Sequence, residues 1–176
     1  GANGYLLDQF LNATVNRRED AWGGTLEQRA RFPLAVVEAV AAAVGPERVG
    51  LRLSPHGTFN DMGDDPEADA MTLHLAEACR HLGLAYLHFV DPVFNGYADG
   101  ERLLREARAR FQGPVIACGD MDSARAERYL EEGIADLIGF GRTYIANPDL
   151  VTRLQRGAPL NEPDPATFYG GDAAGY

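Results

Sequence analysis

The chain has 176 residues, a formal net charge of −10 and 45% hydrophobic residues, which suits one folded domain with a buried core and excludes wholesale disorder. All 16 cationic side chains are arginines, so the sequence contains neither a Schiff-base lysine nor a Walker A lysine. The acidic balance argues against a nucleic-acid binder, and no apolar run approaches the ~20 residues that span a membrane.

Short apolar runs alternate with amphipathic stretches, and one helix has especially clear end signals. Thr25 and Gln28 have the spacing of a capping box, and Gly45 followed by Pro46 ends the same helix. Pro33 lies inside it, where we expect a bend or a weak first turn. In chain order the sequence predicts helix 6–11, helix 26–44, strand 49–53, helix 66–82 capped by Asp65, strand 85–90, helix 101–111, strand 115–118, helix 123–132, strand 136–140, a helix from Asn147-Pro148 to about Gly157, and an irregular tail over 158–176.

This alternation predicts an α/β fold with a parallel sheet buried on both faces, because the four strands are nearly all apolar. Two architectures fit: an open doubly wound sheet, or half of a (β/α)8 barrel. A full barrel takes ~250 residues, and four units use most of this chain, so half a barrel fits its length. In either case the chemistry belongs at the carboxyl ends of the strands.

Two positions at the strand ends indicate an anion site. Arg52 lies inside an otherwise apolar strand, so its guanidinium needs either a core carboxylate or an electron-rich ligand. Gly119 follows the third strand, and Gly141 with Arg142 follows the fourth. Glycine turns after two adjacent strands can aim backbone N–H groups at a phosphate, as the loops after the last two strands of barrels commonly do. The alternative is tight-turn glycines beside a solvated arginine.

The histidines, cysteines and one tyrosine carry weaker signals. The four histidines have no metal-ligand spacing, so we expect no metal site. We expect His88 to be a hydrogen-bonded core residue, whereas His56 could line a site. Cys79 and Cys118 form no CxxC pair, which favours reduced thiols in a cytoplasmic protein. Tyr5 is either a packed aromatic or, if placed over a developing carbanion, a proton donor.

The ordered motifs along the chain resemble those of the old yellow enzymes, the flavin-dependent ene reductases, with the pentaerythritol tetranitrate and N-ethylmaleimide reductase branch most similar. The matching segments are Asn3-Gly4-Tyr5-Leu6-Leu7-Asp8-Gln9-Phe10-Leu11, Asn16-Arg17-Arg18 with Trp22-Gly23-Gly24, Glu27 to Phe32, Arg52-Leu53-Ser54-Pro55 with Gly57-Thr58-Phe59, Ala85-Tyr86-Leu87-His88, Phe140-Gly141-Arg142 with Ile145-Ala146-Asn147-Pro148-Asp149-Leu150, and Phe168-Tyr169-Gly170-Gly171. The resemblance implies a (β/α)8 barrel with non-covalent FMN, of which residues 1–176 supply the C-terminal half.

The resemblance also implies roles on the substrate side. Asn3 would hydrogen-bond the carbonyl or nitro oxygen of the substrate, and Tyr5 would protonate its α-carbon. Phe59, Asn60 and Tyr169 would line the mouth of the substrate site.

On the cofactor side, Arg52 would lie near the N1/O2 edge of the flavin and offset its negative charge. Arg142, with backbone N–H groups near Gly119 and Gly141, would hold the FMN phosphate. Asp120 departs from the family pattern, in which this position often holds a small or neutral residue. A carboxylate beside a phosphate costs binding unless it points away.

The implied reaction reduces the activated C=C bond of an α,β-unsaturated carbonyl or a nitro compound, with NADPH as the reductant of FMN. The chain begins at Gly1 without an initiator methionine, so we interpret it as processed, engineered or excerpted. The expected partner is then the N-terminal half of the same barrel, since the family histidine upstream of Asn3 and the first four strands are missing from the sequence.

Two other interpretations stay open. One is a non-catalytic half-barrel scaffold that dimerises, or that binds phosphate or FMN without turnover. The other is a flavodoxin-like open sheet, against which the phosphate turns after the last two strands argue, because flavodoxin-type sheets normally bind phosphate after the first strand.

Overall fold

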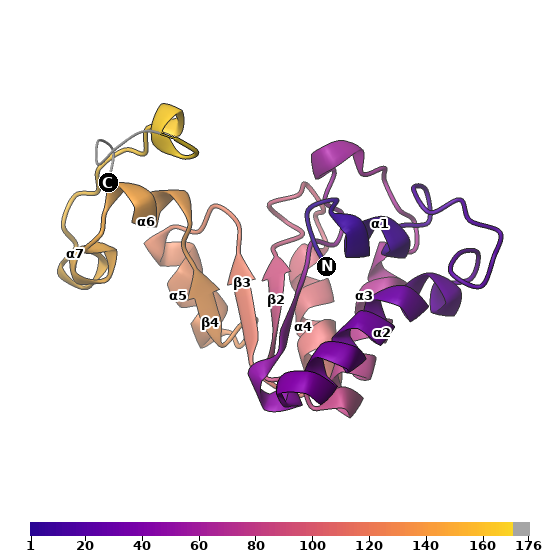
Figure 1. Cartoon of the computed structure of the whole chain (residues 1–176). Helices are drawn as coiled ribbons and strands as arrows, with labels where there is room; N and C mark the ends of the chain where they lie inside the picture. Colours follow the sequence, from indigo (N-terminus) through magenta and orange to yellow (C-terminus); the bar gives the residue numbers. More distant parts are fainter. Residues whose placement is uncertain (171–176) are drawn as a thin grey trace.

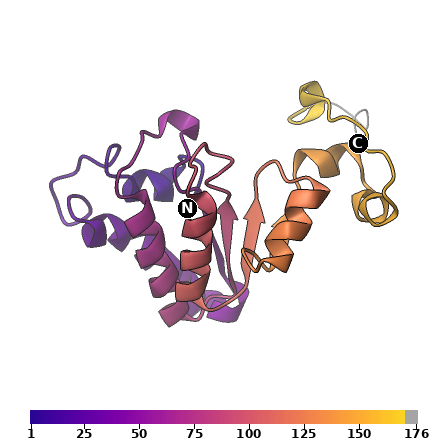
Figure 2. The same cartoon turned by 180° about the vertical axis from the view of Figure 1, so that it is seen from behind.

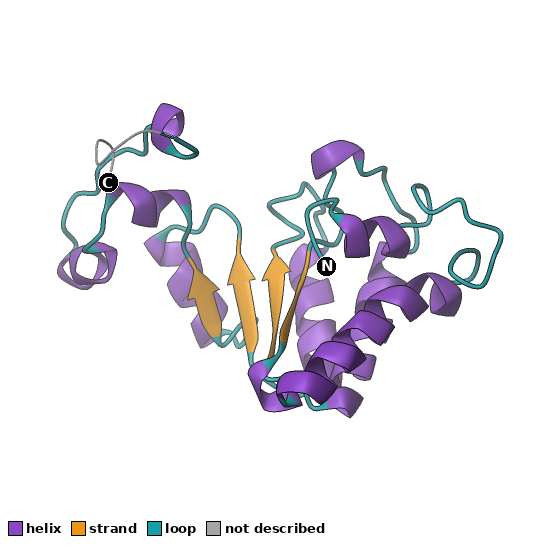
Figure 3. Cartoon of the chain, viewed as in Figure 1, coloured by secondary structure: helices purple, strands orange, loops and turns teal. Residues whose placement is uncertain are grey.

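The computed structural model describes residues 1–170, whose four strands form a single parallel sheet (Figures 1 and 3). The strands are β1 (Gly50–Leu53), β2 (Tyr86–Val90), β3 (Val115–Cys118) and β4 (Leu137–Gly139). The helices are α1 (Leu6–Leu11), α2 (Leu26–Val44), α3 (Ala68–Leu82), α4 (Gly100–Phe111), α5 (Ser123–Glu131), α6 (Arg142–Ala146) and α7 (Leu150–Arg156), with single 3-10 turns η1 (Pro46–Arg48), η2 (Phe59–Asp61) and η3 (Pro165–Thr167).

The strand order identifies the architecture. The strands pair in the sequential order β1-β2-β3-β4. A doubly wound sheet reverses its strand order at a switch point and covers both faces with helices. Here the order does not reverse, and α3, α4 and α5 lie on the same side, behind the strands in Figure 1 and in front of them in Figure 2. This is the arrangement of half a (β/α)8 barrel, so of the two architectures that fit the sequence the half barrel is the one observed.

The face of the sheet that meets the helices contains the core. Along β1 the side chains of Leu51 and Leu53 are buried, and on β2 those of Leu87 and Phe89 are buried. Because neighbouring strands pair in register, these residues form one apolar layer against Leu75 of α3. Each fully buried Leu or Phe side chain contributes about 2 kcal/mol of transfer free energy.

The opposite face, which we call the open face, is only partly covered. Its residues alternate with the core residues and include Arg52, His88, Cys118 and Gly139. At the lower end of the open face Tyr86 is 38% exposed and Leu137 is 53% exposed. The expectation of a sheet buried on both faces is therefore wrong for the described chain, because α3, α4 and α5 lie on one side and leave the open face partly exposed.

The capping box at the start of α2 is confirmed. The Thr25 side chain accepts a hydrogen bond from the Gln28 N–H, and the Gln28 side chain accepts one from the Thr25 N–H. Two donors that the first turn leaves without helical partners are thereby satisfied. The helix runs over Leu26–Val44 as expected, with Pro33 buried in its interior.

Two predicted helix starts are wrong. Helix α3 begins at Ala68 rather than Pro66, because the Asp65 carboxylate accepts hydrogen bonds from the N–H groups of Ala13 and Glu67 and holds a turn instead. Helix α7 begins at Leu150, because the buried Asn147 side chain bonds the Thr143 carbonyl and both backbone groups of the later segment at Asn161.

The short helix α6 is absent from the predicted elements. Its five residues are too few for an apolar period to show. The predicted irregular tail has a single turn, η3, within the described residues, and its last part, 171–176, lies outside them.

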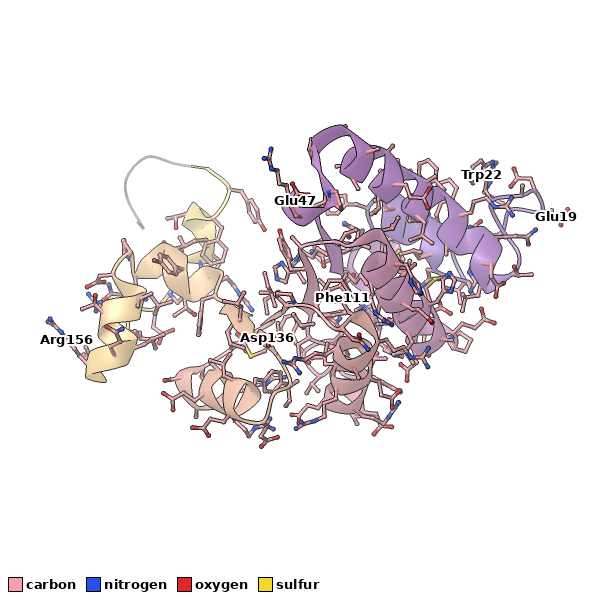
Figure 4. The ribbon with its side chains drawn as sticks, turned by 90° about the horizontal axis from the view of Figure 1, so that it is seen from below. Glu19, Trp22, Glu47, Phe111, Asp136 and Arg156 are labelled. Atoms are coloured by element: carbon pink, nitrogen blue, oxygen red, sulfur yellow. The ribbon has the colours of Figure 1, made fainter. Side chains whose placement is uncertain are left out.

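The lower end of the sheet, where the strands begin, is closed by charged contacts. The Asp136 carboxylate accepts hydrogen bonds from the Arg108 guanidinium at 2.7 Å and from the Val115 N–H at 2.9 Å. The hydrogen bond from Arg108 lowers the pKa of Asp136. Figure 4 looks at this end from below, with Asp136 and Phe111 labelled. In (β/α)8 barrels the end where the strands begin contributes to stability, and the upper, carboxyl end of the strands carries the chemistry.

A buried ion pair fixes α5 to the end of β2. The Asp91 side chain is fully buried and lies 2.6 Å from Arg125 Nη2 and 2.7 Å from the Tyr129 hydroxyl. Burial and the donated hydrogen bond to Asp91 raise the pKa of Tyr129, so the phenol stays protonated. The guanidinium and the hydroxyl together satisfy a carboxylate that could not otherwise be buried.

We predict that Asp91→Asn lowers the free energy of unfolding by about 3 kcal/mol, because it leaves the Arg125 charge without its buried partner. Urea unfolding followed by circular dichroism measures the change. The matched control is Asp149→Asn, which removes an exposed i,i+4 pair with Arg153 and should change the stability by less than about 0.5 kcal/mol. Equal effects of the two substitutions would contradict a structural role for Asp91.

Candidate functional site

Five connections meet at the carboxyl ends of the strands, the upper edge in Figure 1. They are the segment before α1, the loop of residues 54–67 after β1, the loop of residues 91–99 after β2, the turn after β3 and the turn after β4. Of the site residues expected from the sequence, all but two belong to these connections or to the strand β1: Arg142 is the first residue of α6, and Tyr169 lies in the later tail. The sheet therefore brings residues far apart in sequence to one edge.

Asn3 and Asn60 lie together above the end of β1. The Asn3 N–H donates to the Ser54 hydroxyl at 2.7 Å, and the Asn60 side-chain amide donates to the Asn3 carbonyl at 2.8 Å. Asn3 and Gly4 both have left-handed backbones, with φ of 57° and 71°. A Cβ at Gly4 would lie 2.5 Å from the Phe59 carbonyl oxygen, so only glycine permits this close approach.

Asp8 holds this N-terminal turn from the first helix. Its carboxylate accepts hydrogen bonds from the Gly4 N–H at 2.9 Å and from the Ser54 hydroxyl at 3.0 Å. Burial raises the pKa of Asp8, and these two hydrogen bonds oppose the rise. No spacing signal in the sequence marks Asp8 or Ser54, because one carboxylate in a short helix and one hydroxyl after a strand form no recognisable pattern.

The aromatic residues expected around a substrate lie at the surface. Tyr5 precedes α1 and is 65% exposed, and Phe59 is 64% exposed. Tyr169 is fully exposed, so its side chain contacts none of the other expected substrate residues, and its ring lies edge-on to Phe168 with centroids 6.5 Å apart. The described chain therefore brings Asn3, Asn60 and Phe59 together and leaves Tyr169 apart from them.

Arg52 projects onto the open face, half-buried, and reaches across β2. Its Nη2 atom lies 3.5 Å from Cys118 Sγ, although Arg52 is in register with Ile116 two residues earlier in β3. The guanidinium thus leans toward the carboxyl ends of the strands. Among residues 1–170 no carboxylate lies within ion-pair distance of Arg52, so a core salt bridge does not explain this arginine. A thiol is a weak acceptor and leaves most of the guanidinium donors free.

His88 is the neighbour of Arg52 on the open face. The two residues are in register, and His88 Nε2 is buried without a hydrogen-bond partner within the described chain. Burial and the Arg52 charge lower the pKa of His88, which favours the neutral imidazole. A Cβ at Gly139 would lie 3.7 Å from His88 Nε2. The expectation of a hydrogen-bonded core histidine is wrong, because the strands bring no polar group to this atom.

The turns after β3 and β4 approach each other. Gly119 has a left-handed backbone with φ of 128°, and a Cβ there would lie 2.9 Å from the Phe94 Cβ. Arg142 begins α6, and its Nη2 atom lies 3.3 Å from Asp120 Oδ1, in an ion pair with both side chains mostly exposed. A Cβ at Gly141 would meet nothing within 4 Å, so the backbone there is open to approach.

These observations fit anionic groups at two places, one at Arg52 and one, such as a phosphate, at Arg142. The guanidinium of Arg52 lacks an anionic partner in residues 1–170, and open glycine backbone precedes the second guanidinium of Arg142. The one feature against the fit is Asp120, whose carboxylate takes the place beside Arg142 that a phosphate would use.

Metal binding and membrane insertion find no support in the described part of the chain. Residues 1–170 contain no group of three or more His, Cys, Asp or Glu side chains arranged around a common point. None of the helices in this range has the length and apolar character needed to cross a membrane.

Comparisons with known proteins agree on one family. The sequence pattern of the NADH:flavin oxidoreductase / NADH oxidase family matches residues 1–161. The chain is 43% identical over 177 residues to a Leishmania infantum protein named as a probable flavin mononucleotide-dependent alkene reductase, and the match covers 100% of this chain and 47% of that protein. It is 40% identical over 181 residues to 12-oxophytodienoate reductase 2 of Arabidopsis thaliana, covering 100% of this chain and 48% of that protein.

A solved structure of morphinone reductase in complex with tetrahydroNAD superposes with a TM-score of 0.92 at 50% identity, covering 99% of this chain and 47% of that one. The chain thus spans about half the length of the relatives it matches. The similarity supports the half-barrel architecture that the strand order indicates.

The two cysteines should differ in reactivity. Burial raises the pKa of the Cys79 thiol to about 12, whereas Cys118 lies half-buried on the open face. We predict that iodoacetamide at pH 8 modifies Cys118 in the folded protein and modifies Cys79 only after unfolding, since the thiolate is the nucleophile. Peptide mass spectrometry measures both sites, and equal labelling in the native state would contradict the described packing of α3.

Proposed function

Because the chain belongs to the NADH:flavin oxidoreductase / NADH oxidase family, together with the old yellow enzymes, we propose that it supplies the C-terminal half of an FMN-dependent ene reductase barrel. The observation that carries the proposal is the Arg52 guanidinium on the open face, which has no carboxylate partner in the described chain. The substrate class is activated alkenes, namely α,β-unsaturated carbonyl or nitro compounds, and the reductant is NADPH.

The proposed cofactor contacts involve two arginines. FMN, when bound, supplies the hydride-transfer chemistry. Arg52 donates hydrogen bonds to the N1/O2 edge of the ring system and offsets negative charge there. Arg142 and the backbone N–H groups near Gly119 and Gly141 bind the phosphate. The charge-assisted hydrogen bonds between the guanidinium and the phosphate are the strong ones among these contacts.

On the substrate side, the side-chain amide of Asn3 donates a hydrogen bond to the carbonyl or nitro oxygen. This donor polarises the alkene and stabilises the enolate oxygen as it forms. Tyr5 donates a proton from its hydroxyl to the α-carbon. The support for Asn3 is its fixed backbone, held by Ser54 and Asn60, and the support for Tyr5 is its position two residues later at the start of α1. We propose that Phe59, Asn60 and Tyr169 line the mouth.

The proposed partner is the N-terminal half of the same barrel. Its support is the share of the relatives' length that the chain spans, together with the partly exposed open face. The exposed Tyr86 and Leu137 equally favour the second candidate, a non-catalytic scaffold that dimerises through this face. A homodimer in size-exclusion chromatography without FMN affinity would favour the scaffold.

The reaction tests the function directly. We predict that the chain, assembled with a complementary N-terminal half and FMN, shows flavin absorbance that NADPH bleaches and an enone restores. Tyr5→Phe should leave the NADPH step within about twofold and slow the enone step by about 10²-fold, because it removes only the proton donor. Stopped-flow absorbance measures both steps. Bleaching by the chain alone would contradict the need for a partner, and the absence of bleaching in the assembly would contradict the function.

Asp120 generates a second prediction. Asp120→Asn removes the carboxylate that pairs with Arg142, so FMN affinity should rise about two- to fivefold at low salt, and the gain should shrink as salt screens the exposed charges. Titration of flavin fluorescence measures the affinity. Glu38→Gln is the control, because it also removes one exposed negative charge, on α2, and it should leave FMN affinity unchanged. Weaker FMN binding by Asp120→Asn would contradict a phosphate site at Arg142.

A further inference from the structure

His56 occupies a conformation that its surroundings must enforce. It lies in the loop after β1 and has a left-handed backbone with φ of 58°. A non-glycine residue seldom adopts this region and keeps it only when neighbouring contacts fix it. The contacts at His56 therefore hold the loop in place.

Two side chains contact His56 directly, and a third side chain bonds to both of them. His56 Nε2 lies 2.8 Å from Asp69 Oδ1 on α3, and the His56 ring stacks on the Tyr97 ring with centroids 3.7 Å apart and planes at 13°. The Tyr97 hydroxyl donates to Asp69 Oδ2 at 3.0 Å, and Arg102 Nη2 on α4 donates to the same oxygen at 2.7 Å. We call His56, Asp69, Tyr97 and Arg102 the clasp.

The clasp is partly shielded from water. The His56 side chain is 14% exposed and that of Asp69 is 28% exposed. Burial alone would raise the pKa of Asp69, but the hydrogen bonds from His56, Arg102 and Tyr97 outweigh it and lower the pKa. Asp69 consequently stays ionised at neutral pH and accepts from all three donors.

The clasp joins the two loops that form the mouth. The loop 54–67 carries Phe59 and Asn60, and the loop 91–99 carries Phe94 and Asn95. These four residues, with Thr58 and Asp61, line one open hollow. The Asn95 side-chain amide also donates to the Pro55 carbonyl at 3.0 Å, which adds a second tie between the loops. The width of the hollow thus depends on how the clasp holds the two loops.

We propose that His56 and Asp69 are positioning residues that set the width of the substrate mouth and thereby select substrates by size. This inference rests on the proposed function, because the mouth is the one through which the alkene reaches Asn3 and Tyr5. Neither residue touches the substrate, and both act through the loops that carry Phe59 and Phe94.

Amide hydrogen exchange tests the clasp without requiring activity. His56→Ala should speed exchange about tenfold in peptides covering 55–61 and 92–97, and should leave peptides from α2 unchanged. His56→Phe keeps the stacking on Tyr97 but loses the bond to Asp69, so it should recover part of the protection. His81→Ala, an exposed histidine on α3 that lies 3.9 Å from Glu77, is the control and should change nothing. Unchanged exchange in His56→Ala, an equal increase in every peptide, or full recovery by His56→Phe would overturn the proposal.

Kinetics of the assembled, FMN-loaded protein tests the consequence. His56→Ala should change the ratio of KM for a bulky cyclic enone to KM for a small enone by about fivefold or more. The kcat for each enone should stay within about twofold of its value in the unsubstituted protein. Asp69→Asn should shift the same ratio in the same direction, and His81→Ala should not. A loss of kcat with an unchanged KM ratio would overturn the proposal. An assembly without ene reduction would contradict the proposed function alone, and the exchange result would still decide the clasp.

Discussion

The guanidinium of Arg52 sits half-buried on the open face of the sheet with a thiol as its nearest acceptor. A buried cation without a partner is costly, so proteins retain one where an anionic ligand or a hydrogen-bonding group completes it. Beside it, the Nε2 atom of His88 is buried without a partner in the described chain. Under the proposed function, these two polar groups on adjacent strands mark where the ligand supplies charge and hydrogen bonds.

The rest of the upper edge is built from strained backbone on a rigid support. Six non-glycine residues of the described chain have left-handed backbones, and all but Gln112 lie in the connections at the carboxyl ends of the strands: Asn3, His56, Asn60, Asp61 and Asp120. Such strain collects at functional sites because the surrounding structure must hold it. Here Asp8 holds the turn of Asn3, and Asp69 holds that of His56. By contrast, the lower edge is closed by ion pairs such as Arg108 with Asp136.

The sequence predicted the elements that depend on local chemistry. Apolar runs located the ends of the four strands to within one residue, and the capping box located the start of α2. Prediction from the sequence failed where a side chain forms hydrogen bonds with a segment far away in the chain. Asp65 looks like a helix cap but bonds Ala13, and Asn147 looks like a helix start but bonds Asn161.

The same distinction applies to the site. Arg52 was recognisable as a polar residue in an apolar strand, and Gly119 and Gly141 as turns after strands. The hydrogen bonds of Asp8, the stack of His56 on Tyr97 and the pairing of Asp120 with Arg142 join residues from different connections. Only the three-dimensional arrangement of the sheet brings these groups together, so no spacing along the chain predicts these contacts.

Comparing FMN with riboflavin, which lacks the phosphate, tests most directly whether the two arginines bind opposite ends of one cofactor. Isothermal titration of the assembled protein with each compound gives the preference for FMN as a ratio of affinities. Arg142→Ala should reduce that ratio by about tenfold or more, because it removes a charge-assisted phosphate contact. Arg52→Met should weaken the binding of both compounds equally and preserve the ratio. Arg156→Ala, an exposed arginine at the end of α7 labelled in Figure 4, should change neither. A ratio that Arg142→Ala leaves intact, or that Arg52→Met abolishes, would contradict the account.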